Sequence, residues 1–231
     1  MSDHIVSAFS EELEQLSADL LRMGGIAESM ISDACRALIT SDLQLAHETV
    51  DRDGLVDDME ADIEQRIVRL LALRQPMASD LRAVVAALKV SSDLERIGDL
   101  SKNIAKRVDE VSGCDVGGAL KGIERMGRAV SAQLNDVLDS YSEANAAVAL
   151  HVWNSDEDID QHYNSLFREV ITYMMEDPRM IGAGAHLMFI AKNLERVGDH
   201  CTNIAEIVHY QVTGEYLASN ERPKAPLLGN G

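Results

Sequence analysis

Apolar residues recur at alternating intervals of three and four along most of this chain, which is the period of one face of an α-helix. The pattern restarts near the middle of the chain, so it forms two sets of three stripes. No segment shows the alternation of a β-strand or the signal of a hairpin. The sequence therefore predicts an all-α protein, with helices over residues 9–38, 56–70, 81–111, 120–141, 152–173 and 181–208.

The third stripe of each set carries the same short motif. Residues 94–99 read LERIGD and residues 194–199 read LERVGD, so the two copies differ only by Ile against Val. Each copy is followed four positions later by an asparagine, Asn103 or Asn203, and then by Ile-Ala. A match of this length in the same place of both sets indicates that the chain arose by internal duplication.

Two further correspondences support the duplication. Pro76 and Pro178 each stand between the second and third stripe of their set, where the first turn of a helix accepts proline. The start of each second helix also repeats a pattern of two aspartates around an aliphatic residue, Asp53-Val56-Asp57 in the first copy and Asp156-Ile159-Asp160 in the second.

Three amphipathic helices with short connections bury their apolar stripes as an antiparallel bundle. We therefore predict two tandem antiparallel three-helix bundles, over residues 1–113 and 114–214, followed by a flexible polar tail over 215–231 that contains Pro223 and Pro226. A helix of about 30 residues is about 45 Å long, so an elongated molecule is expected.

The chemistry of the chain centres on the repeated motif. Glu95 and Asp99 are spaced i, i+4 and continue the stripe of Leu81, Val84 and Leu88 as carboxylates, which we interpret as a core-facing stripe that turns acidic. Two like charges at this spacing destabilise a helix by about 0.2–0.5 kcal/mol, and by more when they are buried. Because Glu195 and Asp199 repeat the conflict, a cation is expected to resolve it. Oxygen ligands favour magnesium, manganese, calcium or ferric iron, with zinc as a further candidate.

A plainer interpretation of the motif stays open. Lys102, three residues after Asp99, and Lys192, three residues before Glu195, are placed to form ordinary surface ion pairs, and the adjacent arginines of the motif can neutralise neighbouring acids. Gly98 and Gly198 lie in mid-helix, where glycine costs stability, and we expect them to allow the close approach of another helix or of a ligand.

Composition limits the partners. The 231 residues carry 21 basic and 39 acidic side chains, a formal charge of −18, which repels nucleic acids and anionic membrane surfaces. No apolar run approaches the roughly 18 residues needed to span a bilayer, so a cytoplasmic protein without direct membrane insertion is expected. Cys35, Cys114 and Cys201 are far apart in sequence, and we expect reduced core thiols at all three positions.

The motifs LERIGDLSKNIA and LERVGDHCTNIAE, together with RQPMASDLR at 74–82 and YMMEDPR at 173–179, resemble the PhoU family, the accessory proteins of bacterial phosphate-specific transport. The resemblance extends from FSEELEQL near the beginning to about Gly214. It implies two lobes of three helices, a homodimer, and metal clusters of iron or zinc in the first place, with magnesium, manganese or calcium as alternatives. The implied metal ligands are Glu95, Asp99, Asn103, Asp53 and Asp57 in the first copy and Glu195, Asp199, Asn203, Asp156 and Asp160 in the second.

The resemblance also implies a function without catalysis. Such a protein is a negative regulator of phosphate uptake and of the phosphate-starvation response, and it couples the ATPase of the phosphate ABC transporter to a phosphate-sensing histidine kinase. Two alternatives remain: a carboxylate-bridged metal enzyme with redox or hydrolytic activity, and a purely structural helical dimer. The chain has no paired Glu-x-x-His motif and no nucleophile with an adjacent base, which weakens the case for an enzyme.

Overall fold

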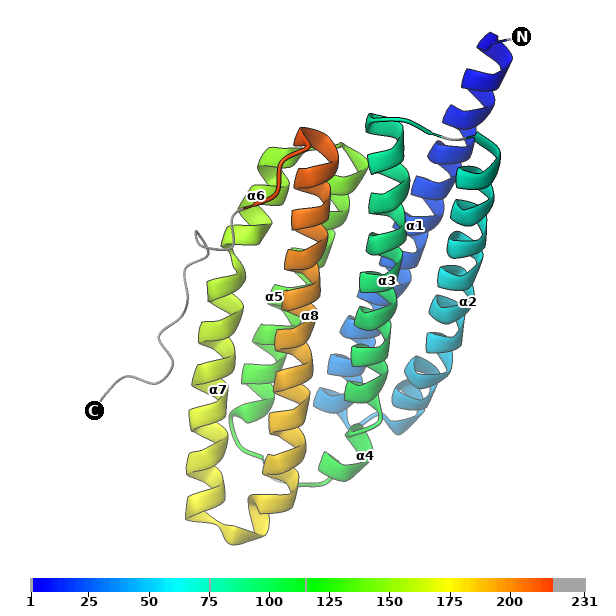
Figure 1. Ribbon diagram of the computed structural model, residues 1–231. Coiled ribbons are helices and arrows are strands. Elements are labelled where there is room, and N and C mark those ends of the chain that lie inside the picture. Colours follow the sequence, from blue (N-terminus) through cyan, green and yellow to red (C-terminus); the bar gives the residue numbers. More distant parts are fainter. Residues whose placement is uncertain (1, 75, 115, 218–231) are drawn as a thin grey trace.

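The computed structural model describes residues 2–74, 76–114 and 116–217, with the side chains of residues 2–8 and 156 outside the description (Figure 1). Within these residues the secondary structure is helical and contains no strand, which confirms the predicted all-α class. The long helices are α1 (Ser2–Thr40), α2 (Leu43–Arg74), α3 (Ser79–Ala105), α5 (Ala119–Ser142), α7 (Asp156–Glu176) and α8 (Ile181–Thr213). Shorter elements are α4 (Val108–Val111), α6 (Ala146–Asn154) and the 3₁₀ turn η1 (Pro178–Met180).

The fifth apolar stripe forms two helices rather than the single one expected. The backbone N–H of Ser155 donates to the carbonyls of both His151 and Val152 at 3.1 Å, and its hydroxyl donates to Val152 O at 2.8 Å. A serine that bonds to the preceding turn in this way competes with regular helical hydrogen bonding. The chain therefore changes from α6 to α7 at Ser155, shortly before the second pair of aspartates.

The connection between the first and second helices of each half ends in a capping residue of the same kind. Asp42 Oδ1 accepts a hydrogen bond from Leu45 N at 3.0 Å, and Asn145 Oδ1 accepts from Ala147 N at 3.1 Å. Each of these two capping residues satisfies an N–H at the start of the second helix of its half. The duplication is thus present in the turns as well as in the motif.

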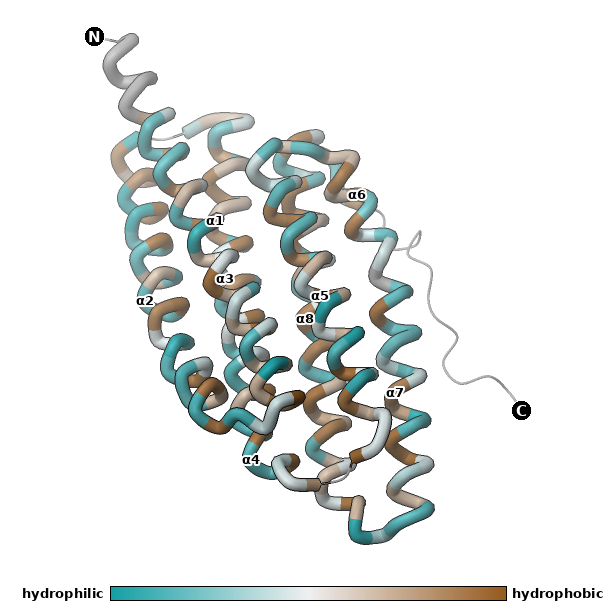
Figure 2. Tube along the Cα trace, turned by 180° about the vertical axis from the view of Figure 1, so that it is seen from behind, coloured by the Kyte–Doolittle hydropathy of each residue, from teal (hydrophilic) through white to brown (hydrophobic). Residues whose placement is uncertain are grey.

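The helices lie side by side along one long axis, as expected from their lengths (Figure 1). Helices α1–α3 pack together, α5–α8 pack together, and the two groups meet where α3 runs beside α8 and α1 beside α5. Apolar and polar residues alternate around each helix (Figure 2), and one continuous core links both groups, with Leu20, Ile97, Ile123 and Val197 fully buried. No helix among the described residues combines the length and apolar character needed to cross a membrane.

Helices α3 and α8 form an antiparallel seam between the two halves. Contacts that follow α3 toward its C-terminus move toward the N-terminus of α8: Arg82 Nε to Gln211 O (3.4 Å), Asp93 Oδ1 to His200 Nδ1 (2.8 Å), and Arg107 Nη1 to His186 Nδ1 (3.3 Å). Asp93 directly precedes the first motif and His200 directly follows the second. The two LERxGD motifs therefore lie beside each other near the middle of the seam.

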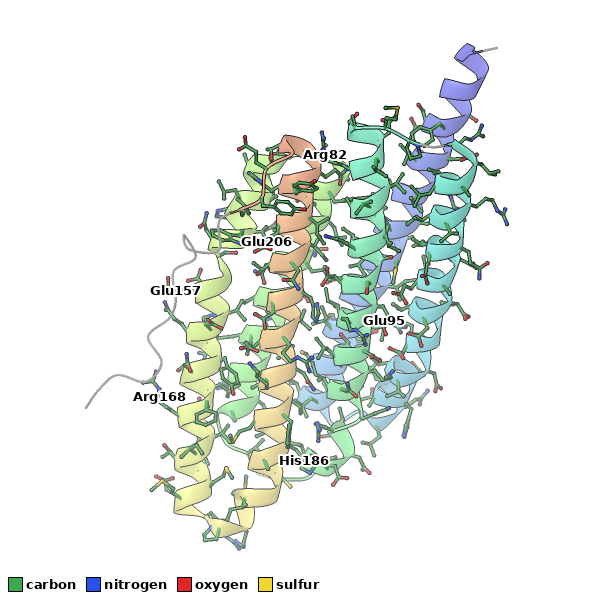
Figure 3. All side chains as sticks on the ribbon, viewed as in Figure 1. Arg82, Glu95, Glu157, Arg168, His186 and Glu206 are labelled. Atoms are coloured by element: carbon green, nitrogen blue, oxygen red, sulfur yellow. The ribbon has the colours of Figure 1, made fainter. Side chains whose placement is uncertain are left out.

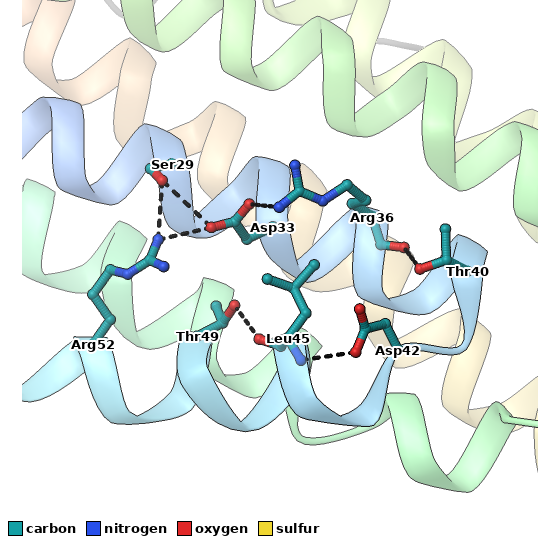
Figure 4. Close-up of polar contacts among 8 residues, drawn as sticks. All are labelled: Ser29, Asp33, Arg36, Thr40, Asp42, Leu45, Thr49 and Arg52. Carbon is teal, nitrogen blue, oxygen red and sulfur yellow. Dashed lines mark hydrogen bonds and ion pairs between the residues drawn. The ribbon is translucent and has the colours of Figure 1, made fainter.

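A polar cluster joins α1 to α2 near the turn between them (Figure 4). Asp33 accepts hydrogen bonds from Arg36 and Arg52, both at 2.8 Å, and Arg52 also donates to Ser29 Oγ at 2.9 Å. Asp53 directly follows Arg52 in α2. The cluster therefore holds α2 against α1 next to Asp53, the first carboxylate of α2 that faces the motif.

Glycines allow α1 and α5 to approach closely. A Cβ atom built on Gly127 would stand 2.6 Å from Cys35 Sγ, whereas a Cβ on Gly25 meets nothing within 4 Å. We expect Gly127→Ala to lower the free energy of unfolding by about 1–2 kcal/mol because the added methyl overpacks the contact. Gly25→Ala is expected to raise it by about 1 kcal/mol through helix propensity. Urea unfolding of both variants measures the difference, and equal effects would contradict the close packing of α1 on α5.

The cysteines divide into two kinds. Cys35 and Cys201 are buried as expected, but the prediction for Cys114 is wrong, because it follows α4 in an exposed turn. Burial raises the pKa of the Cys35 thiol to about 12. One thiol per native chain is therefore expected to react rapidly with Ellman's reagent at pH 8, and Cys114→Ser is expected to abolish that rapid phase. A rapid phase that persists in this variant would place a second thiol at the surface.

Candidate functional site

The motif carboxylates lie on the side of α3 that faces α2, where Figure 3 shows Glu95. The stripe they continue is not core-facing throughout, and in this respect the sequence prediction was wrong. Val84 is fully buried, but Leu81 is 42% and Leu88 37% exposed. Helix α3 packs against α1, α2 and α8 together, so apolar residues are needed on several of its sides and a single stripe does not define the core.

In the first copy a lysine stands between the carboxylates of two helices. Lys102 Nζ lies 2.5 Å from Asp53 Oδ2 on α2 and 2.5 Å from Asp99 Oδ1 on α3. Burial lowers the pKa of Lys102, but the hydrogen bonds to Asp53 and Asp99 outweigh this effect and raise the pKa above its usual value. Asp53 is only 5% exposed, and its Oδ1 has no hydrogen-bond partner among the described residues. The ammonium group thus occupies the position where a bound cation was expected.

The carboxylates of the first copy still repel one another despite this lysine. Arg96 lies 3.4 Å from Glu95 Oε2 and 3.6 Å from Asp99 Oδ2, in the neutralising role expected of it. Even so, burial raises the pKa of Glu95, and the charges of Asp99, Glu60 and Asp57 add to the rise against the opposing effect of Arg96. Burial and the nearby Asp53 likewise raise the pKa of Asp57.

The second copy brings together Glu195, Asp199 and Asp160. Burial raises the pKa of Glu195, and repulsion from Asp199 and Asp160 adds to the rise, while Lys192 opposes it. Lys192 Nζ lies 2.5 Å from Glu195 Oε1, but Oε2 of the same carboxylate is buried without a hydrogen-bond partner among the described residues. Asp156 begins α7, and its side chain lies outside the described residues.

The two copies differ at one decisive position. Thr202 stands where the first copy has Lys102, and its hydroxyl donates to Gly198 O at 2.9 Å within the helix. Lys192 in turn corresponds to Ser92. The second copy therefore has no ammonium group at the position that Lys102 occupies between the carboxylates of α2 and α3.

The two asparagines differ in their surroundings. Asn103 is exposed on α3. Asn203 Nδ2 reaches across the seam and donates to Asp93 Oδ1 at 3.3 Å. In the described part of the chain, no three His, Cys, Asp or Glu side chains converge closely enough to hold a metal ion.

The motif glycines explain why the aspartates lie near the motifs. A Cβ on Gly98 would stand 3.2 Å from Val56 Cγ1, and a Cβ on Gly198 would stand 3.3 Å from Ile159 Cγ2. The predicted close approach of another helix is thereby confirmed in both copies. Because Val56 and Ile159 each directly precede an aspartate, Asp57 or Asp160, the contact carries these carboxylates toward the motif.

Sequence reasoning missed two participants. Glu60, one turn after Asp57, raises the pKa of Glu95 and could have been found from its i, i+3 spacing. The contact of Asp93 with His200 joins residues 107 positions apart, and no local pattern signals it. The i, i+3 spacing predicts Lys102 only as a partner of Asp99, although its ammonium group also binds Asp53 on another helix.

Comparison with known proteins identifies the family. The PhoU domain matches this chain twice, over residues 20–108 and 123–208, once in each half. The phosphate-specific transport system accessory protein PhoU homolog of Caulobacter vibrioides is 52% identical over 99% of both chains, and that of Rhizobium meliloti is 48% identical over 96% of this chain and 93% of its own. The crystal structure of PhoU from Pseudomonas aeruginosa has a TM-score of 0.86 at 39% identity, covering 90% of this chain and 100% of that one. The chain therefore belongs to the PhoU family.

Proposed function

We propose that this protein is an accessory protein of phosphate-specific transport that represses phosphate uptake and the phosphate-starvation response when phosphate is plentiful. The observation that carries the proposal is the 52% identity, over nearly the whole of both chains, to a relative with that name. In this role it couples the transporter ATPase to a phosphate-sensing histidine kinase in the cytoplasm, as a homodimer and without catalysis. Its acidic surface suits such contacts, because charge complementarity orients partners and speeds their association.

A deletion strain grown in high phosphate tests this function. Alkaline phosphatase activity is expected to rise from its repressed level, and the intact gene supplied in trans is expected to restore repression. The phosphate content of the deletion strain, measured in the same cultures, is the control, because it separates loss of signalling from loss of phosphate supply. Unchanged repression in the deletion strain would overturn the proposal.

A bound metal is the second part of the proposal, and the donor chemistry fits it better in the second copy. There, Glu195 has a buried oxygen without a hydrogen-bond partner among the described residues, and it lies close enough to Asp199 and Asp160 for their charges to raise its pKa. These three carboxylates, with Asp156 as a fourth candidate, would hold an iron or zinc ion, or a magnesium, manganese or calcium ion, after side-chain rotation. The ion would neutralise the acids and join α7 to α8.

The first copy fits a metal only if Lys102 moves away. Its ammonium group already bridges Asp53 and Asp99, so a cation must displace two short ion pairs to bind there. We therefore assign the first copy to internal neutralisation by lysine and the second to the metal. Asn103, one turn after Asp99 and exposed, stays a candidate ligand of the first copy, whereas the amide of Asn203 is bound to Asp93 across the seam.

A further inference from the structure

An open groove lies at one end of the seam between the halves. Leu81 and Val85 of α3 and Ile207 and Tyr210 of α8 line it, together with Tyr216, which follows α8 and stacks on Tyr210 with 4.2 Å between the ring centroids. We refer to it as the seam groove. Its cavity volume is about 260 Å³, below the roughly 300–1,000 Å³ of most small-molecule sites and suited to one large side chain. Leu81 and Val85 are 42% and 36% exposed, so apolar lining faces water here.

The rim of the seam groove carries positive charge on a strongly acidic protein. Arg82 and Lys89 lie on the α3 side, and Lys89 is exposed without a hydrogen bond or ion pair to any described residue. The acid on the α8 side, Glu206, already accepts a hydrogen bond from Trp153 Nε1 at 2.9 Å. Figure 3 shows Arg82 and Glu206 at the same end of the seam. A bound segment with carboxylates would therefore meet two cations, Arg82 and Lys89, and one carboxylate, Glu206, which is hydrogen-bonded to Trp153.

The other end of the seam shows what can occupy the corresponding place. By the internal repeat, Phe189 corresponds to Lys89 and Arg107 corresponds to Ile207. The guanidinium of Arg107 lies over the Phe189 ring, 4.5 Å from its centroid, and Arg107 also contacts His186 of α8. One end of the seam thus carries the Phe189 ring against a cation, while the groove at the equivalent end has the stacked rings of Tyr210 and Tyr216 in its wall and a lysine, Lys89, at the position of Phe189.

We infer that the seam groove binds an acidic segment of a partner protein, which inserts one aromatic side chain between α3 and α8. The ring would contact Leu81, Val85 and the stacked pair of Tyr210 and Tyr216, and flanking carboxylates would pair with Lys89 and Arg82. A nucleic acid or a lipid surface fits poorly, because its phosphates would extend beyond the two cations of the rim onto the rest of the molecule, whose formal charge of −18 repels them. The carboxylates of a short segment can stay beside Lys89 and Arg82. This surface is a new element beyond the proposed regulatory role and does not depend on the metal.

Binding of a synthetic peptide tests the inference on the full-length protein. The probe is the fluorescein-labelled peptide EDEFEDE, with EDESEDE and KRKFKRK as companions, and fluorescence anisotropy measures the dissociation constants. EDEFEDE is expected to bind at least about tenfold more tightly than EDESEDE, because only the former fills the apolar lining. Lys89→Glu is expected to weaken its binding by about tenfold or more through like-charge repulsion and to improve binding of KRKFKRK.

Lys121→Glu is the matched control, since it makes the same change of charge at an exposed position of α5 outside the seam groove. Equal weakening by Lys121→Glu and Lys89→Glu would overturn the inference, because the effect would then come from net charge alone. Equal affinities for EDEFEDE and EDESEDE would also overturn it. Sedimentation supplies the remaining check: if Lys89→Glu converts a dimer to a monomer, the seam groove contacts a second copy of this chain and the partner segment is excluded. None of these readouts involves alkaline phosphatase, so failure here leaves the regulatory proposal intact.

Discussion

Lys102→Met is expected to lower the free energy of unfolding by about 2–3 kcal/mol at pH 7, because it leaves two carboxylates facing each other without a cation. Methionine keeps most of the length and the apolar stem of lysine, so the loss reports mainly on the charge. Asp53 is 5% exposed, and desolvation makes its unpaired charge costly. Urea unfolding of the metal-free protein measures the change.

Lys192→Met is the matched control, and its expected cost is below about 1 kcal/mol because an exposed ion pair contributes little. The side chain of Lys192 is 48% exposed and has one carboxylate partner, whereas that of Lys102 is 20% exposed and has two. Addition of zinc or manganese is expected to restore part of the stability of Lys102→Met, since a cation can then enter the first copy. Equal costs for the two variants would show that Lys102 is not the internal cation of this site.

The helical period placed Glu95 and Asp99 on one side of α3 correctly, because that inference needs only the geometry of a single helix. It could not say what that side faces. The contact of Lys102 with Asp53 joins residues 49 positions apart and depends on how α2 lies against α3. The helical period also does not indicate which side of α3 packs against the other half. It therefore predicts Leu81 and Leu88 in the core, although both are partly exposed.

The duplication was a stronger guide to the fold than any single pattern. It predicted equivalent close contacts at Gly98 and Gly198, and both exist, because the same backbone approach recurs in each half. It was a weaker guide to chemistry, since equivalent positions hold different residues. Lys102 against Thr202 and Lys89 against Phe189 give the two halves different electrostatics on nearly the same backbone.

That asymmetry predicts opposite effects when motif acids are neutralised in the two copies. Without metal, Glu195→Gln combined with Asp199→Asn is expected to stabilise the protein at pH 7. The pKa of Glu195 is raised by burial and by neighbouring acids, so at a pH above the ordinary carboxyl pKa its ionised form opposes folding. Asp99→Asn in the first copy is expected to destabilise the protein, because it removes a partner of the partly buried Lys102. Glu95 is left unchanged in this variant, because its pKa is raised in the same way as that of Glu195.

Bound metal is expected to reverse this difference in stability, so that the native protein becomes more stable than the Glu195→Gln, Asp199→Asn variant. At a free zinc or iron concentration 100 times the dissociation constant, the native protein gains about 2.7 kcal/mol, and the Glu195→Gln, Asp199→Asn variant gains nothing from that site. Thermal unfolding with and without metal, together with elemental analysis of protein purified without chelator, measures both effects. If the native protein carries no metal and gains no stability from it, and the variant still restores repression of alkaline phosphatase, the metal has no part in regulation. The charges of Glu195 and Asp199 would then also have no part in repression, and the regulatory proposal would stand on the protein contacts alone.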